Sequence, residues 1–257
     1  MQVIRKTAIA LFILSLLCLN LFGGALSQSI TPGVSAGNTF TYSVKGLWSS
    51  NDSNATISES ILQLNKTDYI RVTITNVSES DVNMHILWRF INGTESEIDD
   101  EINVATGIYT RWFWAVFPAN LNAGDRIHPH GPDRTTVNAS YTREFLDETR
   151  EINRYRVTGE FASTDNTNRT YSDIMTVHFD RQIGMLVELY DYKTYTNPAY
   201  FETIIWEIID TNTFGSSEPP PNQEIPLVII IVPVAIIIAL IAFIAYRKRF
   251  AKPRKKR

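Results

Sequence analysis

The feature that most constrains this chain is a run of twenty uncharged, mostly apolar residues near its C-terminal end, at 227–246. A helix of this length, rising about 1.5 Å per residue, matches the roughly 30 Å hydrocarbon core of a bilayer. Pro233 lies inside the run, and a membrane-spanning helix tolerates proline better than a soluble helix does. Eight of the last eleven residues are Lys or Arg, which marks the cytoplasmic flank of a span. We therefore predict a transmembrane helix at 226–246 and a basic cytoplasmic tail at 247–257.

A second apolar run lies at the N-terminal end and is typical of a secretory signal peptide. Two basic residues precede it, and Ala25 and Ser27 place small side chains at the positions that signal peptidase recognises. This pattern predicts a signal peptide at 1–27, cleaved before Gln28. The alternative is an uncleaved N-terminal anchor, because the run is long enough to span. With the signal removed, the chain is a single-pass cell-membrane protein with its N-terminus outside.

The charged residues divide between the two sides of this predicted membrane. All 27 acidic residues and fourteen basic ones lie between the two apolar runs, giving that part a formal charge of −13, whereas the tail carries +8. An acidic, self-repelling surface suits an exported domain and argues against nucleic acid as a partner. The single cysteine, Cys18, lies in the signal peptide. We therefore expect no disulfide, thiolate zinc site or thiol catalysis in the exported domain.

The exported part divides into a domain at 28–210 and a short Pro/Ser-rich stalk at 211–225, which contains three consecutive prolines. Sequons of the type Asn-x-Ser/Thr make the domain a candidate glycoprotein. The seven candidate asparagines are Asn51, Asn54, Asn65, Asn76, Asn92, Asn138 and Asn168.

Alternation of apolar and polar residues with period two dominates 28–210 and predicts half-buried antiparallel strands. In 39–45, for example, Phe40, Tyr42 and Val44 share one face. The same alternation recurs at 69–75, 84–90, 137–141 and 154–161, and the strand at 200–210 is apolar on both faces near its centre, as a central strand would be. The sequence thus predicts a mainly β domain, a curved antiparallel sheet in the form of a half-barrel or a sandwich.

Residues 105–121 fit two structures. Ile108, Trp112 and either Ala115 or Val116 fall on one face of a helix, which favours a helix that covers one side of the sheet. A further strand remains the alternative. The cluster of Trp112, Phe113 and Trp114 is more typical of a core than of a ligand-binding box.

Turn signatures punctuate the strands. Residues 173–192 predict a hairpin whose turn, from Asp180 to Gly184, places Gly184 in the left-handed region. An apolar residue followed by Ala-Gly-Asn or Ala-Gly-Asp occurs at 34–38 and, 87 residues later, at 121–125. Glycine accepts a positive φ in such a turn, and Asn or Asp bonds its own backbone. The repeat indicates either two related halves or the same turn used twice.

These turns together resemble a group of uncharacterised archaeal single-pass cell-surface proteins, in which a β-rich ectodomain lies between a signal peptide and a stalk with a C-terminal anchor. The resemblance covers most of the ectodomain. It implies a strongly curved sheet similar to the lipoprotein-carrier (LolA-like) half-barrel, with the ectodomain outside the cell. Its motifs are turns, so it implies no activity. Relatives often carry Thr before the hairpin glycine, where this chain has Ile183.

The sequence contains no catalytic, phosphate-binding or dinucleotide-binding motif, so we expect a protein that is not an enzyme and uses no cofactor or metal. His128 and His130 flank a proline with a spacing that suits zinc poorly. The acidic run at 95–101 lacks the spacing of a calcium loop, which favours a solvated loop. His178 is expected to face solvent from the polar side of its strand.

Two functions from different classes fit this organisation. The first is a glycosylated, membrane-anchored surface module for adhesion or envelope assembly, which binds another surface protein or a polysaccharide. The second is a binder of lipid or another apolar ligand in a cavity of the curved sheet. The expected lining of that cavity is Trp88, Trp112, Trp114 and Trp206. Whether the concave face is filled or hollow separates the two functions.

Overall fold

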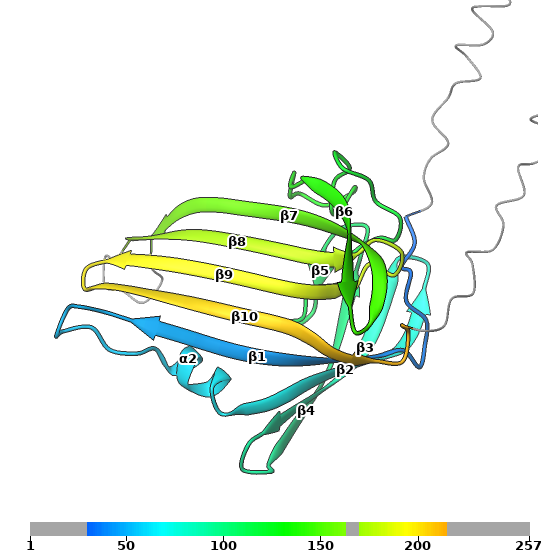
Figure 1. Ribbon diagram of the computed structural model, residues 1–257. Coiled ribbons are helices and arrows are strands. Elements are labelled where there is room, and N and C mark those ends of the chain that lie inside the picture. Colours follow the sequence, from blue (N-terminus) through cyan, green and yellow to red (C-terminus); the bar gives the residue numbers. More distant parts are fainter. Residues whose placement is uncertain (1–29, 163–169, 215–257) are drawn as a thin grey trace, which may run out of the picture. The chain divides into compact units, whose positions relative to one another are not determined.

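The computed structural model describes residues 30–162 and 170–214, which form one antiparallel sheet of ten strands (Figure 1). Two meanders build it, β1–β5 and β6–β10, and the order across the sheet is β5-β4-β3-β2-β1-β10-β9-β8-β7-β6. The first and last strands therefore pair at its centre. The elements are β1 Thr39–Ser49, α2 Glu59–Leu64, β2 Thr67–Ser78, β3 Asp81–Phe90, β4 Glu95–Asn103, β5 Ile108–Tyr109, β6 Ala139–Phe145, β7 Glu148–Ala162, β8 Thr170–Asp180, β9 Leu186–Thr196 and β10 Ala199–Thr211.

The predicted mainly β, antiparallel fold is confirmed, as a single open sheet rather than the two packed sheets of a sandwich. The expected central strand is β10, which pairs with β1 and β9. Among the described residues, no helix has the length and apolar character needed to cross a bilayer. The predicted signal peptide, transmembrane helix, basic tail, sequon Asn168 and the stalk beyond Phe214 lie outside the described residues.

The acidic run at 95–101 is part of strand β4, so the expected solvated loop is wrong. Along β4 the acidic side chains mostly point to solvent, whereas Ile98 and Ile102 lie on the other face and pack with the core. Asp100 lies on the same face as Ile98 and Ile102 and is buried. The density of charge hides an ordinary period-two strand.

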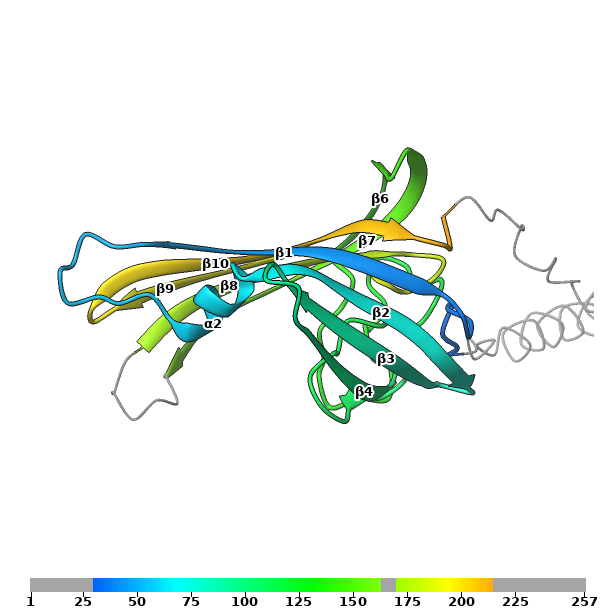
Figure 2. The same ribbon diagram turned by 90° about the horizontal axis from the view of Figure 1, so that it is seen from below.

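A segment at 110–138, the covering segment, packs on one face of the sheet without forming a helix (Figure 2). The expected helix at 105–121 is therefore wrong. The backbone of this segment bonds to the sheet instead: Phe117 N–H donates to Gly184 O at 2.7 Å, and Leu186 N–H donates to Ala115 O at 3.2 Å. Pro118 has no N–H and further disfavours a helix at this point.

The core lies between the covering segment and the sheet face it touches, here called the inner face. Phe40 and Tyr42 of β1 are fully buried there, and the Tyr42 hydroxyl donates to Leu186 O at 3.0 Å. Phe117 of the covering segment is also fully buried, with its ring centre 4.4 Å from that of Phe179 on β8. The covered part of the inner face is thus filled by side chains.

The β8–β9 turn has the predicted form. Gly184 has a φ of +70°, and Asp180 Oδ1 accepts the N–H groups of Gln182 and Ile183 at 2.8 and 2.9 Å. A Cβ atom on Gly184 would lie 2.0 Å from Phe117 O, so the covering segment approaches this turn as closely as a glycine permits.

The two Ala-Gly-Asn/Asp turns are the same structure. In each, the glycine φ is close to +90° and the following side chain accepts the N–H three residues earlier. The bonds are Ser35 N–H to Asn38 Oδ1 at 2.6 Å and Asn122 N–H to Asp125 Oδ2 at 2.7 Å. The first turn leads into the central strand β1, whereas the second lies in the covering segment. This contrast favours one turn used twice over a duplication.

Candidate ligand-binding face

The inner face extends beyond the covering segment along the far ends of β7–β10 and β1, the long strand ends that project in Figure 1. We call this part the distal face. The strand registers arrange its side chains in three successive rows. Outward from the core, the first row is Val157, Met175, Asp191, Ile204 and Gly46; the second is Gly159, Asp173, Lys193, Glu202 and Trp48; the third is Phe161, Tyr171, Tyr195 and Tyr200.

Helix α2 packs on the β1 side of the distal face. Ser58 caps the helix by accepting the Ile61 N–H, and Ile61 is fully buried. A Cβ atom on Gly46 would lie 2.9 Å from the Ile61 side chain, so glycine allows the helix to lie against β1. Asn65 fixes the end of the helix, because its Oδ1 accepts Gly46 N–H at 3.0 Å and its Nδ2 donates to Gly46 O at 2.9 Å.

Two carboxyl groups and a lysine meet in the middle of the distal face. Lys193 Nζ donates to Asp191 Oδ2 at 2.8 Å and lies 6.0 Å from the centre of the Tyr171 ring. Burial, a hydrogen bond with Asp191 and the charge of Asp191 together raise the pKa of Asp173 to about 7, although the nearby charge of Lys193 acts in the opposite direction. Asp173 Oδ1 and Asp191 Oδ1 are both buried without a hydrogen-bond partner, and a proton on Asp173 would supply a donor at this position.

Glu202 and Trp48 leave two buried polar atoms without partners. Glu202 is only 6% exposed, and its Oε1 has no hydrogen-bond partner among the described residues. Trp48, its directly paired neighbour on β1, has a buried Nε1–H that likewise has no partner within 30–162 and 170–214. An unsatisfied buried polar group costs about 1–3 kcal/mol, and more if it is charged. The two unsatisfied groups are directly paired across β1 and β10 and lie on the distal face.

The aromatic row closes the far side of these polar groups. Tyr195 and Tyr200 stack with ring centres 4.2 Å apart, and Tyr171 lies 5.1 Å from Tyr195. Phe161 continues the row at 5.5 Å from Tyr171 and is 42% exposed. The row therefore forms a rigid wall across four strands, with one ring open to solvent at its end.

The four tryptophans expected to line a cavity do not form one group. Trp112 lies with its ring centre 5.6 Å from Trp88 and 5.8 Å from Trp206, so these three are in contact. Trp206 is 9% exposed and packs against core rings, whereas Trp88 and Trp112 are half-buried. Trp114 instead contacts Phe117 of the core, at 6.3 Å. The first three mark the boundary between the filled core and the distal face.

Asp100 fixes Trp112 at this boundary. The buried carboxylate accepts four backbone N–H groups at 2.9 Å, two on each oxygen: Glu101 and Arg111 on Oδ1, Trp112 and Phe113 on Oδ2. Burial alone would raise the pKa of Asp100, but these backbone bonds outweigh it and the pKa is lowered. A single side chain of β4 thus holds the beginning of the covering segment.

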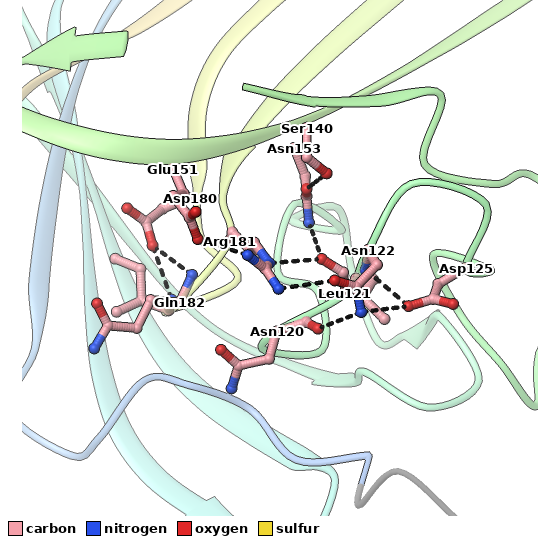
Figure 3. A network of polar contacts seen from close by, with 11 residues as sticks. Asn120, Leu121, Asn122, Asp125, Ser140, Glu151, Asn153, Asp180, Arg181 and Gln182 are labelled. Carbon is pink, nitrogen blue, oxygen red and sulfur yellow. Dashed lines mark hydrogen bonds and ion pairs between the residues drawn. The ribbon is translucent and has the colours of Figure 1, made fainter. Parts of the chain in front are cut away.

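A polar network holds the middle of the covering segment (Figure 3). Arg181 donates to Leu121 O at 3.2 Å, to Asn122 Oδ1 at 2.8 Å and to Glu151 Oε2 at 2.6 Å. Asn153, fully buried on β7, donates to the same Leu121 O at 2.8 Å. These groups satisfy one another, and their role is to attach the covering segment to β7 and the β8–β9 turn.

A cluster of charged and polar side chains also lies on the opposite, outer face. Glu188 of β9 is buried beneath the β6–β7 hairpin and accepts Arg143 Nη1–H at 2.8 Å and the Tyr190 hydroxyl at 3.0 Å. Burial would raise the pKa of Glu188, but bonds from His178, Arg143 and Tyr190 lower it to about 2. His178 Nδ1 lies 3.0 Å from Glu188 Oε2. The expectation that His178 faces solvent is therefore wrong.

The described residues offer no group of three or more His, Cys, Asp or Glu side chains placed to hold a metal ion. His128 is buried beside Phe117, with its Nδ1 2.8 Å from Val104 O. Burial lowers the pKa of His128, which favours the neutral ring.

All six sequon asparagines in the described residues are exposed. Asn65 differs from the others because both ends of its amide bond Gly46. A glycosylated amide keeps one N–H, and in the favoured trans form this N–H points away from Oδ1. It cannot then close the paired bonds with Gly46. Glycosylation of the sequons stays a prediction, with Asn65 as the least suitable position.

The residues of the distal face were not found by sequence reasoning. Glu202 and Asp191 were the available signal, because each places a carboxylate at the strand parity of apolar neighbours such as Ile204 and Leu189. The pairing that brings Trp48 to Glu202 joins strands far apart in the sequence.

No protein-family model matches the sequence, and no curated protein matches it.

Proposed function

We propose that this protein is a membrane-anchored, glycosylated cell-surface module of archaeal type that binds its ligand on the distal face. The sequence supports the anchor, because a single apolar run with a basic flank follows an acidic, sequon-rich domain. The observation that carries the binding role is the distal face itself, a part of the sheet beyond the covering segment where Glu202 and Trp48 leave buried polar atoms without partners among the described residues. We also propose that the sheet has the curved form of a LolA-like half-barrel.

An apolar ligand is the second candidate, with a specific observation in its favour. The partly buried Trp88, Trp112, Met175 and Ile204 all pack against the core, so apolar surface continues from the core onto the distal face. Against it, Trp112 and Trp206 fill the space between them by contacting each other. The row of charges beside Ile204 also suits a lipid chain poorly.

The test uses the full-length chain, purified in a mild detergent and mixed with isolated envelopes of the source cells. Binding is measured by co-sedimentation for the wild type, E202Q and the matched control E207Q. Glu207 lies on the same strand but is exposed on the outer face. We expect E202Q to weaken envelope binding at least tenfold and E207Q to leave it unchanged.

A wild-type chain that does not bind envelopes, or equal binding by both variants, would contradict the proposal. A lipid that stays bound when the protein is transferred to a second, chemically different detergent would support the apolar-ligand candidate instead, provided that the W112A variant loses it. Surface biotinylation of intact cells tests the predicted orientation independently, since the acidic domain should be labelled and the basic tail should not.

A further inference from the structure

The outer face of the sheet carries an apolar patch behind the distal face. Of the eleven large apolar side chains that are exposed in the described residues, four lie here: Leu47 is 53% exposed, Phe201 40%, Tyr190 39% and Tyr192 38%. The strand registers place them close together on β1, β10 and β9, and their directly paired neighbours include the half-buried Ile174 and Ile205. We call these six residues the outer patch.

The composition of the outer patch is that of a protein interface. Among the described residues, no charged side chain separates its members, and those between them on this face are Thr176, Thr194 and Thr203. The exposed Lys45 and Glu207 lie at its edge. Charged residues are depleted, and aromatic residues enriched, in the buried centre of protein interfaces. An uncharged, aromatic patch on a domain of formal charge −13 therefore indicates a contact with another protein.

The direction of β10 favours a second copy of this chain as that protein. β10 runs from the outer patch toward Thr211, and the predicted anchor follows it in the sequence. At about 3.4 Å per residue, Phe201 lies roughly 34 Å from Thr211 along the strand. Copies anchored in one membrane present this face at the same height and in the same orientation.

A two-fold axis along the strands meets the constraint that the anchor imposes. It brings one outer patch onto the other, and it keeps the C-terminal ends of both domains on the side of the membrane. Two sheets that pack face to face in aligned fashion have strand directions within about 30° of each other. The arrangement required by the anchor is therefore one that β-sheets commonly adopt.

We propose that two copies of the chain associate through the outer patch, face to face, with the two-fold axis along their strands. Association removes Leu47, Phe201 and the two tyrosines from water, which supplies the driving force. This goes beyond the proposed function, because the outer patch lies on the opposite side of the sheet from the distal face. The dimer carries two distal faces that point away from each other, so a polymer with repeated sites is held at two points.

The first experiment measures the mass of the full-length chain in a mild detergent, by sedimentation velocity over a range of protein concentrations. L47E and F201E each place a charge in the outer patch of both copies. The matched control is I91E, which makes the same kind of change at a side chain that is 69% exposed in the β3–β4 turn. Urea unfolding checks that the three variants are as stable as the wild type.

The second experiment tests the same contact in the membrane, where no detergent competes for the patch. T203C lies at the patch centre, paired with Leu47 and Tyr192, and is treated in isolated membranes with a short thiol cross-linker. T75C, at an exposed position on β2, is the control. The wild type gives the background from Cys18.

We expect a wild-type dimer whose dissociation constant rises at least tenfold in L47E and in F201E and is unchanged in I91E. We also expect a cross-linked dimer from T203C and none from T75C. A T203C cross-link that L47E suppresses supports the proposal even where detergent separates the copies.

A wild type that stays monomeric in detergent, together with a T203C variant that forms no cross-linked dimer, overturns the proposal. Dimerisation that L47E and F201E leave intact also overturns it and assigns the dimer to another part of the chain. Cross-linking of T203C to a different protein overturns it in favour of that partner. None of these results bears on the binding of E202Q to envelopes, so the proposed function fails or stands separately.

Discussion

Replacing Asp100 by asparagine tests how the covering segment is held. The carboxylate is 4% exposed and accepts four backbone N–H groups, two on each oxygen. An asparagine amide has one oxygen and one NH₂ group. In either orientation of the amide, the NH₂ group faces two of the four backbone N–H groups, and these two lose their acceptor. A hydrogen bond to a charged group contributes about 1.5–3 kcal/mol, so losing two of them should lower the free energy of unfolding by about 3–6 kcal/mol. That is a large part of the 5–15 kcal/mol typical of a domain.

The measurement is urea unfolding of D100N at pH 7, followed by the fluorescence of the five tryptophans, of which Trp112 is one. The matched control is D99N, one residue earlier on the same strand, where the side chain is 88% exposed and bonds His85. We expect the control to change stability by less than about 1 kcal/mol. A D100N protein within about 1 kcal/mol of the wild type, or a control that loses as much, would refute this account of the segment.

The pH dependence of the same variant gives a second check. The pKa of Asp100 is lowered in the folded state, so its contribution is complete above the unfolded pKa near 4 and is lost as the pH falls through the folded value. The stability difference between wild type and D100N should therefore shrink below pH 4. A difference that stays constant down to pH 2 would contradict the role of the charge.

Three further predictions concern glycine, a buried acid and glycosylation. G184A should lose about 3 kcal/mol or more in urea unfolding, because it adds a clash with a backbone carbonyl to a positive φ, whereas G124A, at a similar φ in open space, should lose about 1 kcal/mol; equal losses would contradict this. The folded pKa of Asp173, about 7, lies above its unfolded value, so the wild type loses stability as the pH rises from about 4 to 7. D173N should be more stable than the wild type by about 1–3 kcal/mol at pH 8 and similar to it at pH 4, and a variant less stable at pH 8 would refute the shift. Glycopeptide mass spectrometry should show much lower occupancy at Asn65 than at the exposed Asn76 in the same preparation, and full occupancy at Asn65 would contradict the role of its bonds to Gly46.

Most of the sheet could be predicted from the sequence because its signals are local. Period-two alternation identifies β1 from Phe40, Tyr42 and Val44, and the Asp-to-Gly turn at 180–184 identifies the β8–β9 hairpin. Each of these patterns depends on residues within about ten positions of one another. β4 was missed because its charged residues conceal the alternation of Ile98 and Ile102.

The covering segment and the distal face could not be predicted, because both depend on contacts between distant residues. Ile108, Trp112 and Val116 have a helical spacing by chance, because the segment does not form a helix. What decides the backbone is Asp100, which lies outside the segment and takes up its N–H groups. In the same way, Glu202 meets Trp48 only because β10 pairs with β1.

The central position of β1 and β10 has a consequence for how the domain assembles. Each meander consists of neighbours in sequence and can form early, but the junction joins Phe40 to Thr211, so the loop closed there is nearly the whole domain. Until β10 is complete, β1 and β9 both present open strand edges. The two ends of the domain also meet, since Thr39 N–H donates to Asn212 Oδ1 at 2.8 Å. A circular permutant that joins 30 to 214 would turn the junction into a local hairpin, and should reach the same sheet faster.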